Sequence, residues 1–222
     1  MKLYKIPDQK IEVIYNGYEK LGVESSDKNN QSNEEKIKDI ATTTDYILYV
    51  GTIQPRKNIS TLLKAFAKFV QSNPTYKLIL VGKKGWMYEK IFEEVTTLNL
   101  TNSVIFTGFL PDNTVSKLYQ NAFCYVLPSL YEGFGIPILE AMAHGSPVLA
   151  SYASSLPEIG GEACLYFDPQ NPDDLADKLT MLKASPSLRS DLIKKGKERI
   201  TLFSWDRCGK QTLEVLMNSY QK

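Results

Sequence analysis

The 222-residue chain has few of the residues from which disulfide scaffolds and metal centres are built. It holds three cysteines, Cys124, Cys164 and Cys208, which form no C-x-x-C pair, and one histidine, His144. This spacing argues against a disulfide framework and a structural zinc site, and it favours a reducing compartment. A single histidine also excludes a zinc site of several histidines and any Ser/His/Asp triad that does not use His144.

An excess of charge of one sign and long apolar runs are missing as well. Lys and Arg number 26 against 25 Asp and Glu, so the net charge of +1 creates no global field that recruits nucleic acid. No apolar stretch reaches the roughly 18 residues of a membrane span, and the first residues lack the apolar region of a signal peptide. These absences predict a cytoplasmic protein without a transmembrane segment and with a local basic site, and they leave peripheral membrane contact open.

At roughly 150 residues per domain, the length corresponds to about one and a half domains. Residues 24–39 are mostly Ser, Asn, Gln and charged residues, which is typical of a linker or a solvated loop. We expect a polar linker over residues 23–45 between a leader, residues 1–22, and a dense block, residues 46–222. The leader is too short to fold alone, and IEVIY at residues 11–15 is expected to form one strand.

In the dense block, short apolar runs alternate with helical periods. The runs begin at residues 46, 76, 104, 122, 147 and 163. The first helical period places Ile59, Leu62, Leu63, Phe66 and Val70 on one face. Strands that are apolar throughout, with helices between them, imply a parallel sheet covered on both faces. The pattern predicts a doubly wound α/β fold of about six strands, followed by extra C-terminal helices. The last helix carries an apolar face of Trp205, Leu213, Leu216 and Met217.

Ligands of open parallel sheets bind beyond the carboxyl ends of the strands, so the residues after each apolar run are the candidates. Arg56 and Lys57 follow the first strand at the start of a helix, where Asn58 or Ser60 is a candidate N-cap. Cations there oppose the helix dipole by about 0.3–1 kcal/mol each, which makes sense if an anion is bound. Solvated side chains explain this segment about equally well.

The second and third strands end in turns that suit a flat ligand. Gly82 and Lys83 follow the second strand, where a glycine lets a ligand approach the backbone. Gly108, Phe109 and Leu110 follow the third and form an apolar turn that is able to wall a ring. A tight turn with a solvated lysine, and simple turn packing, are the structural alternatives.

The fourth crossover, LPSLYEGFGIPILEAMAHGSPV, is the most informative. Glu132 precedes a Gly-Phe-Gly turn, and Pro137 suits the first position of a helix that carries Glu140. The amides of Phe134, Gly135 and Ile136 at this helix start would cradle a phosphate or sugar hydroxyls. Glu140, one turn into the helix, would accept hydrogen bonds from a vicinal diol. Taken singly, each glutamate is explained as well by a surface role, and His144 is assigned a structural role near the helix end.

The block from YVGTIQPRKNISTLLKAF through LILVGKKG, VIFTGFLPDNTVSKLYQNA, PSLYEGFGIPILEAMAHGSPVLAS, SSLPEIGGEACLYFDP and FSWD is recognisable. Over about residues 46–222 it resembles the C-terminal, donor-binding domain of family 4 (group 1) retaining glycosyltransferases with the GT-B fold. The E-x7-E element formed by Glu132 and Glu140 carries most of this resemblance.

The resemblance implies a role for each matching position. Lys57 would contact the donor diphosphate, Glu132 would lie near the donor sugar and reaction centre, and Glu140 would hold the ribose hydroxyls. The remaining matching residues are Phe134, Gly135 and Ile136 for sugar and phosphates, and Gly82, Lys83, Gly108, Phe109 and Leu110 for the nucleoside. The chain departs from many relatives at Thr52, which follows Gly51 where they carry an arginine, and Arg56 is expected to supply the missing charge.

The expected function is donor binding for retaining hexosyl transfer from a nucleotide diphosphate sugar to a glycan or lipid-linked acceptor. No D-x-D pair is present, so neither a metal nor another cofactor is expected, and Arg56, Lys57 and the helix start would stabilise the leaving diphosphate. The PRKN loop favours GDP-mannose slightly over UDP-sugars. The acceptor would bind a missing N-terminal domain or a partner chain, so activity alone should be weak or absent.

The sequence also allows three alternative functions. The chain is also compatible with the nucleotide-sugar-binding half of a split enzyme, or with a GT-B nucleotide-sugar epimerase. A dinucleotide-dependent dehydrogenase is disfavoured because no G-x-G-x-x-G follows the first strand.

Overall fold

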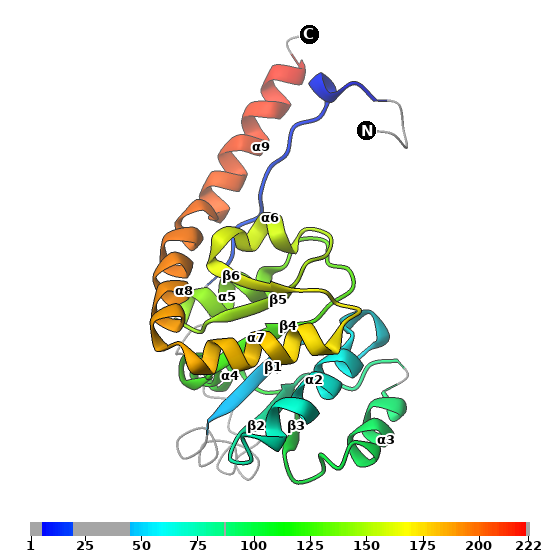
Figure 1. Ribbon diagram of the computed structural model, residues 1–222. Helices are drawn as coiled ribbons and strands as arrows, with labels where there is room; N and C mark the ends of the chain where they lie inside the picture. Colours follow the sequence, from blue (N-terminus) through cyan, green and yellow to red (C-terminus); the bar gives the residue numbers. More distant parts are fainter. Residues whose placement is uncertain (1–5, 20–44, 87, 221–222) are drawn as a thin grey trace. The chain divides into compact units, whose positions relative to one another are not determined.

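The computed structural model describes residues 6–19, 45–86 and 88–220 (Figure 1). The chain divides into two compact units: Lys20–Ile200 forms one, and Met1–Glu19 together with Thr201–Lys222 forms the other. The last residues, which the sequence analysis assigned to the donor-binding domain, thus group with the N-terminal residues. Of the predicted linker, residues 23–45, only Asp45 lies within the described residues.

The larger unit is built on a six-stranded sheet whose strand pairs are all parallel. The strands are β1 (Tyr46–Val50), β2 (Lys77–Val81), β3 (Val104–Gly108), β4 (Cys124–Leu127), β5 (Val148–Ser151) and β6 (Cys164–Phe167). Their order across the sheet is β3-β2-β1-β4-β5-β6. Both the strand number and the doubly wound parallel architecture are as predicted, because uniformly apolar runs are typical of strands buried on both faces.

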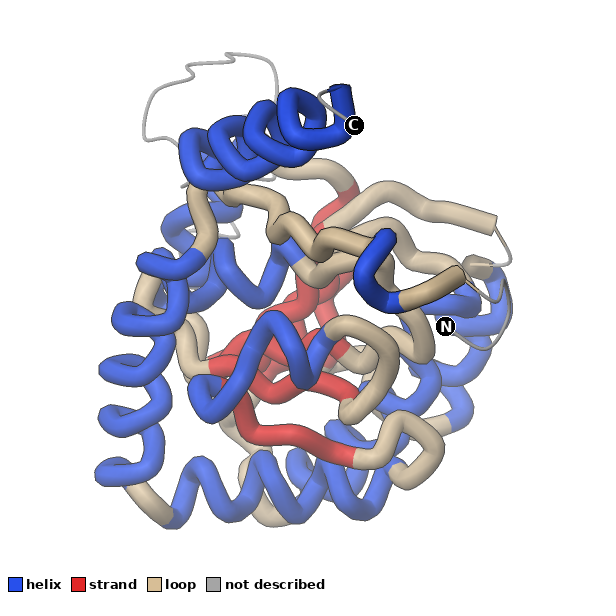
Figure 2. Tube along the Cα trace, turned by 90° about the horizontal axis from the view of Figure 1, so that it is seen from above, coloured by secondary structure: helices blue, strands red, loops and turns tan. Residues whose placement is uncertain are grey.

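Helices cover both faces of this sheet (Figure 2). They are α2 (Ile59–Gln71), α3 (Glu89–Thr97), α4 (Asp112–Asn121), α5 (Ile136–Ala143), α6 (Leu156–Gly160), α7 (Pro172–Ala184) and α8 (Pro186–Arg199), with the 3₁₀ turns η2 (Pro55–Lys57) and η3 (Gly161–Ala163). The chain passes from the larger to the smaller unit within the 3₁₀ turn η4 (Ile200–Leu202). Helix α2 packs against α3 and α7, and α5 packs against α4, α6 and α8. The two groups lie on opposite faces because the chain winds from β1 toward one edge of the sheet and from β4 toward the other.

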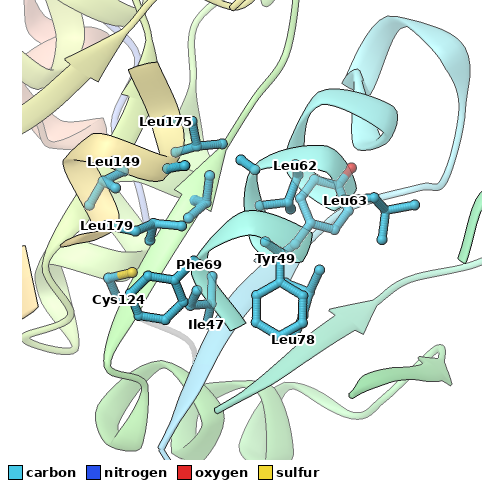
Figure 3. Packing of buried hydrophobic residues seen from close by; sticks show 14 of the residues in the cluster. Ile47, Tyr49, Leu62, Leu63, Phe69, Leu78, Cys124, Leu149, Leu175 and Leu179 are labelled. Carbon is cyan, nitrogen blue, oxygen red and sulfur yellow. The ribbon is translucent and has the colours of Figure 1, made fainter. Parts of the chain in front are cut away.

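The core fills the space between the sheet and the α2–α7 layer (Figure 3). Four of the five residues predicted for the inner face of α2, including Leu62 and Phe66, are fully buried, while Val70 is half-buried at its edge. They meet β1 and β4 residues such as Ile47 and Cys124, and Leu179 of α7 closes the layer. This packing makes the sheet a rigid support for the loops at its carboxyl edge.

The smaller unit consists of an extended N-terminal segment and one long helix. It contains η1 (Asp8–Lys10) and α9 (Trp205–Tyr220), and the ring of Tyr15 meets Phe203 edge-on at 5.6 Å between centroids. The expectation of a strand at residues 11–15 is wrong, because this segment pairs with no strand among the described residues. The predicted apolar face of α9 is exposed, with Leu213 59% and Leu216 62% accessible.

Candidate functional site

The central strands β1 and β4 are neighbours, and the chain leaves them toward opposite edges of the sheet. Such a point, where the strand order reverses, opens the crevice in which open α/β sheets bind their ligands. Arg56 and Lys57 lie in the 3₁₀ turn η2 that follows β1, and Glu132 lies in the loop that follows β4. The fold therefore brings Glu132 to two adjacent cations that precede it by about 75 positions in the sequence.

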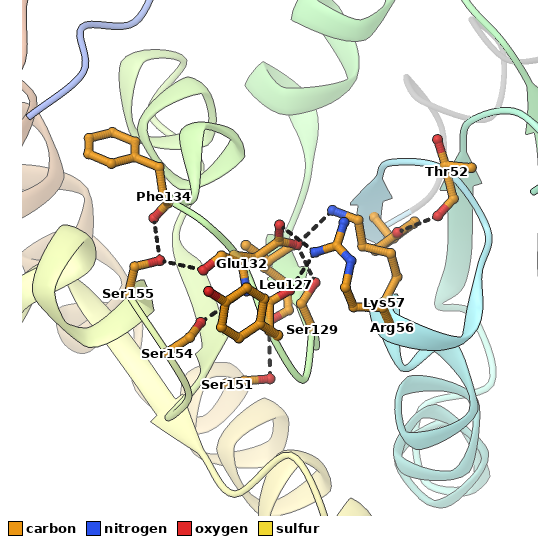
Figure 4. Close-up of polar contacts among 12 residues, drawn as sticks. Thr52, Arg56, Lys57, Leu127, Ser129, Glu132, Phe134, Ser151, Ser154 and Ser155 are labelled. Atoms are coloured by element: carbon orange, nitrogen blue, oxygen red, sulfur yellow. Dashed lines mark hydrogen bonds and ion pairs between the residues drawn. The ribbon is translucent and has the colours of Figure 1, made fainter. Parts of the chain in front are cut away.

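The carboxylate of Glu132 joins the two loops (Figure 4). Lys57 Nζ lies 2.6 Å from Oε1, and Arg56 Nη1 lies 3.0 Å from Oε2. Ser129 donates a further hydrogen bond to Oε1 at 2.6 Å, and Arg56 also donates to the main-chain oxygen of Tyr131. The side chains of Lys57 and Glu132 are only 12% and 11% exposed, whereas that of Arg56 is 43% exposed. The site thus holds two positive charges and one negative charge, with the lysine pair the better shielded.

This arrangement sets the ionisation of Glu132. Burial alone raises the pKa of the carboxyl, but the hydrogen bonds from Lys57, Ser129 and Arg56 outweigh it, and the pKa lies below its ordinary value. Glu132 is therefore a carboxylate at neutral pH.

The turn that follows Glu132 needs a glycine at one position. Gly135 adopts φ 108° and ψ 36°, and an added Cβ would lie 2.9 Å from Leu156 Cδ2. The turn starts α5 at Ile136, so Pro137 occupies the second helical position rather than the first, as the sequence had suggested. Phe134, Gly135 and Ile136 thus stand at the start of α5, where a helix presents its positive dipole end.

Two serines after β5 anchor this turn (Figure 4). The Ser155 hydroxyl lies 3.0 Å from the main-chain oxygen of Glu132 and 2.9 Å from that of Phe134. The Glu132 amide donates to the Ser154 hydroxyl at 2.9 Å. The loop that carries Glu132 is consequently held from the β5 side as well as from the β1 side.

A cavity of about 370 Å³ lies at the carboxyl ends of β1 and β2. Its lining contains seven of the predicted residues: Gly51, Thr52, Gly82, Lys83, Phe109, Leu110 and Glu140. Val50, Val81, Asp112 and Val115 complete it. Gly82 permits a close approach of the strand ends, because an added Cβ would lie 2.0 Å from the Gly51 oxygen. The Lys83 ammonium stands 5.2 Å from the centroid of the exposed Phe109 ring, which offers a flat surface at the cavity wall.

Glu140 reaches this cavity from the second turn of α5. Its Oε2 accepts a hydrogen bond of 3.3 Å from the hydroxyl of Tyr119 on α4. Burial raises the pKa of Glu140; the Tyr119 hydrogen bond opposes this and the charge of Asp112 adds to it, so the pKa lies above its ordinary value. The alternative of an ordinary surface helix residue is thereby excluded for Glu140.

The predicted residues fall into two groups. Arg56, Lys57, Glu132 and the Phe134–Ile136 turn flank the β1–β4 point, whereas seven of the other eight line the cavity. Gly108 ends β3 and does not line it. Arg56 pairs with Glu132 at 3.0 Å, and that it supplies the charge missing at Thr52 stays a prediction.

Asn58 departs from its predicted role. It stands at the N-cap position of α2 with φ 55°, yet its side chain makes no capping bond. Its amide group instead donates to the main-chain oxygens of Pro128 and Pro169, at 3.0 and 2.8 Å. Asn58 thus ties the β4 and β6 loops to the start of α2.

His144 has the structural role assigned to it. It is 7% exposed at the end of α5, and its Nδ1 lies 2.7 Å from the main-chain oxygen of Glu140. Because a carbonyl only accepts, Nδ1 carries the proton and donates it.

The sequence analysis missed four polar residues that hold the two glutamates: Ser129, Ser154 and Ser155 around Glu132, and Tyr119 behind Glu140. The position of the serines after strand ends was the one feature of the sequence that pointed to a role in the site. Tyr119, in contrast, has the pattern of an ordinary core residue of a helix. Among residues 6–19, 45–86 and 88–220, no three His, Cys, Asp or Glu side chains gather as a metal-binding group. Within the same residues, no helix combines the length and apolarity that crossing a bilayer requires.

The amino-acid sequence of the chain matches a known protein family. Residues 30–199 match the family model described as "Glycosyl transferases group 1". The O-antigen chain mannosyltransferase B of Escherichia coli is 38% identical over 171 residues, which are 77% of this chain and 45% of that protein.

Solved structures of glycosyltransferases have a similar fold. Sucrose-phosphate synthase from Thermosynechococcus elongatus superimposes on 95% of the chain with a TM-score of 0.78 and 29% identity, and 53% of that structure is covered. The C-terminal domain of a glycosyl transferase group 1 family protein from Francisella tularensis matches 78% of the chain with a TM-score of 0.66 and 25% identity; 92% of it is covered. The chain spans about half the length of the curated relative and of the synthase, and nearly all of the isolated domain.

Proposed function

Because the chain belongs to the group 1 glycosyltransferases, we propose that the carboxyl edge of its sheet binds a nucleoside diphosphate sugar for retaining hexosyl transfer. The observation that carries this proposal is the pairing of a nucleoside-sized cavity, bordered by Glu140, with a cationic cluster around Glu132. The two features are joined by α5, which begins between them.

The nucleoside would occupy the cavity. A base would lie against Phe109 and the glycine backbones of the strand ends. Glu140, which α5 contributes to the lining, would accept hydrogen bonds from the ribose hydroxyls. The lining thus offers apolar surface for the base and a carboxylate for the diol.

The diphosphate would lie toward Lys57, Arg56 and the start of α5. Transfer requires that the charge developing on the leaving diphosphate be neutralised, and preorganised cations and helix amides do this without moving. Glu132 keeps both cations in place and leaves a net positive charge of one on the three side chains. This charge would be available to the leaving group, with the sugar held near Glu132, so no metal ion is needed in the proposed mechanism.

We favour GDP-mannose slightly as the donor. The 38% identical relative is named a mannosyltransferase, and the PRKN loop that contributes Arg56 and Lys57 is similar to that of such enzymes. The acceptor, a glycan or lipid-linked sugar, would bind a second domain or a partner chain, as befits a chain that matches an isolated C-terminal domain. Activity of this chain alone would then be weak or absent.

A thermal-shift panel of GDP, UDP and ADP tests the donor site directly. A nucleotide at 100 times its dissociation constant should stabilise the fold by about 2.7 kcal/mol, and we expect GDP to give the largest shift. A larger shift with UDP would correct the choice of base but keep the site. If none of the three raises the melting temperature, the chain does not hold a nucleotide donor.

A further inference from the structure

Glu140 is held by an aromatic cluster that lies behind the cavity. Tyr119 of α4 is fully buried, and its hydroxyl is the group that donates to Glu140 Oε2. Its ring stacks on His144 at 5.6 Å between centroids, with 16° between the planes, and meets Tyr125 of β4 edge-on at 5.3 Å. The ring therefore has little freedom to move away from the carboxylate.

The same cluster holds both the side chain and the main chain of Glu140. Tyr119 binds the carboxylate, while His144, stacked on Tyr119, donates to the Glu140 carbonyl oxygen at 2.7 Å. A carboxylate fixed at only one end of a flexible side chain would sample several rotamers. Glu140 is instead restrained at its backbone and at one of its two oxygens.

The second oxygen is left for the cavity. Within the part of the chain that the structure describes, Tyr119 is the only group that donates to the Glu140 carboxylate, and Glu140 is part of the cavity lining. An ionised carboxylate has about four acceptor positions, so one tyrosine hydrogen bond leaves room for a diol. Burial raises the pKa of Tyr119 well above its ordinary value, so its hydroxyl is protonated and able to donate at neutral pH.

We propose that Tyr119 is a positioning residue that fixes the carboxylate of Glu140 in the orientation and the charge state required to accept the ribose hydroxyls of the donor. The proposal rests on the nucleotide site described above and adds a residue that touches no substrate. Tyr119 acts through Glu140, and its hydroxyl replaces part of the hydration that the carboxylate loses on burial.

The charge state follows from the surroundings of Glu140. Burial works against ionisation and the Tyr119 hydrogen bond works for it, so removal of the hydroxyl should raise the pKa of Glu140 further. The other ionisable groups that face it are Asp112 on α4, Tyr125 on β4, His144 on α5 and Lys83 after β2. Because the carboxylate is the form that accepts a diol, nucleotide affinity should fall as the pH drops through this pKa.

The test is the substitution Tyr119→Phe, which keeps the ring and removes the hydroxyl. Calorimetric titrations would compare GDP with 2′,3′-dideoxy-GDP, and UDP with its dideoxy analogue, between pH 5 and 8. We expect the wild-type chain to prefer the ribonucleotide about tenfold or more, as is typical of a hydrogen bond to a charged group. In Tyr119→Phe this preference should shrink to about threefold or less, and the loss of affinity at low pH should begin at a higher pH.

Tyr46→Phe is the matched control. Tyr46 is also fully buried, and its hydroxyl donates at 2.7 Å to the main-chain oxygen of Leu118, the residue before Tyr119, without contacting Glu140. It should lower the melting temperature slightly, like any lost buried hydrogen bond, yet keep the ribose preference and the pH profile. A Tyr119→Phe/Glu140→Gln double variant should show no further loss beyond Glu140→Gln, since the two residues act as one unit.

The outcomes separate this inference from the proposed function. If the wild-type chain binds no nucleotide, or binds without ribose preference, the nucleotide site itself is wrongly assigned. If it shows the preference and Tyr119→Phe retains both that preference and the wild-type pH profile, the site stands and the positioning role of Tyr119 is refuted. A preference lost equally in Tyr46→Phe would also refute it, because the effect would then be one of general packing.

Discussion

The two glutamates that stand on either side of the α5 turn are in opposite electrostatic states. Glu132 is paired with two cations and a serine, and its pKa lies below the ordinary value. Glu140 is partly buried, faces no cation at ion-pair distance among the described residues, and has a raised pKa. Seven intervening residues thus separate a carboxylate stabilised by charge from one that is tolerated at a free-energy cost.

This difference indicates which part of a ligand each end of the site is suited to bind. The Glu132 end holds two cations against one carboxylate, and this net positive charge suits a diphosphate that arrives and leaves with its own negative charge. The Glu140 end keeps an undersaturated acceptor in a mostly apolar cavity, as suits a neutral diol. A folded protein that retains an unfavourable buried carboxylate commonly does so at a functional site.

The largest effect is expected from Lys57→Ala. It removes the shielded cation that would stabilise the leaving diphosphate, so turnover in the complete enzyme should fall by about 10²–10³-fold. Lys64→Ala is the control, because Lys64 lies on the exposed side of α2, 3.5 Å from Glu94. Steady-state rates of sugar transfer measure both; a Lys57→Ala enzyme that keeps at least half of the wild-type rate would remove this residue from the mechanism.

The same substitution at the two glutamates should change stability with opposite sign. Glu132→Gln leaves Lys57 and Arg56 without their carboxylate, and we expect it to lower the free energy of unfolding by about 1–3 kcal/mol. Glu140→Gln removes a buried charge while keeping an acceptor for Tyr119, so it should leave stability unchanged or raise it at neutral pH. Urea denaturation at pH 7 measures the free energy of unfolding of both variants. Equal destabilisation by the two substitutions would contradict the proposed difference between the two carboxylates.

The contrast between the two glutamates should shrink as the pH falls. The stabilisation from Glu132, whose folded pKa is depressed, is complete above the ordinary pKa of about 4.3 and is lost as the pH falls through the folded pKa. Glu140 has a raised folded pKa and takes up its proton first in the folded protein, so acidification relieves its unfavourable contribution. The advantage of Glu140→Gln over wild type should therefore vanish at lower pH. Denaturation curves from pH 7 to pH 4 would show it, and a constant difference would contradict the raised pKa.

The smallest effects concern the glycines of the turn between the two glutamates. Gly135→Ala forces a side chain into φ 108° and against Leu156, and it should lower the free energy of unfolding by about 1–3 kcal/mol. Gly133→Ala meets nothing within 4 Å and should leave the melting temperature nearly unchanged. Thermal denaturation of both variants measures the difference; equal destabilisation would mean that the turn is constrained otherwise than by Gly135.

The sequence predicted the sheet well because the signals for it are local. Uniformly apolar runs marked all six strands, and the inner face of α2 was visible in its periodicity. The expectation of a strand at residues 11–15 was wrong, because the apolar residues of one segment do not show whether a neighbouring strand exists to pair with it.

The site was predictable in its residue types and less so in its contacts. Glu132, Lys57 and Glu140 follow strand ends, where a parallel sheet exposes its ligand-binding loops. That Arg56 would meet Glu132, and that Tyr119 would hold Glu140, depends on how α4, α5 and the loops pack in three dimensions. Such long-range contacts leave no trace in spacing or composition.

The central claim, that the nucleoside binds at Glu140 and the diphosphate at Lys57, is tested most directly by titrating guanosine, GMP and GDP into the wild type, Lys57→Ala and Glu140→Gln by calorimetry. We predict that wild-type affinity rises with each phosphate, that Lys57→Ala removes most of this rise while it leaves guanosine binding intact, and that Glu140→Gln weakens all three ligands by a similar factor. Equal weakening of guanosine and GDP by Lys57→Ala, or a Glu140→Gln chain that binds guanosine as well as the wild type, would contradict the account.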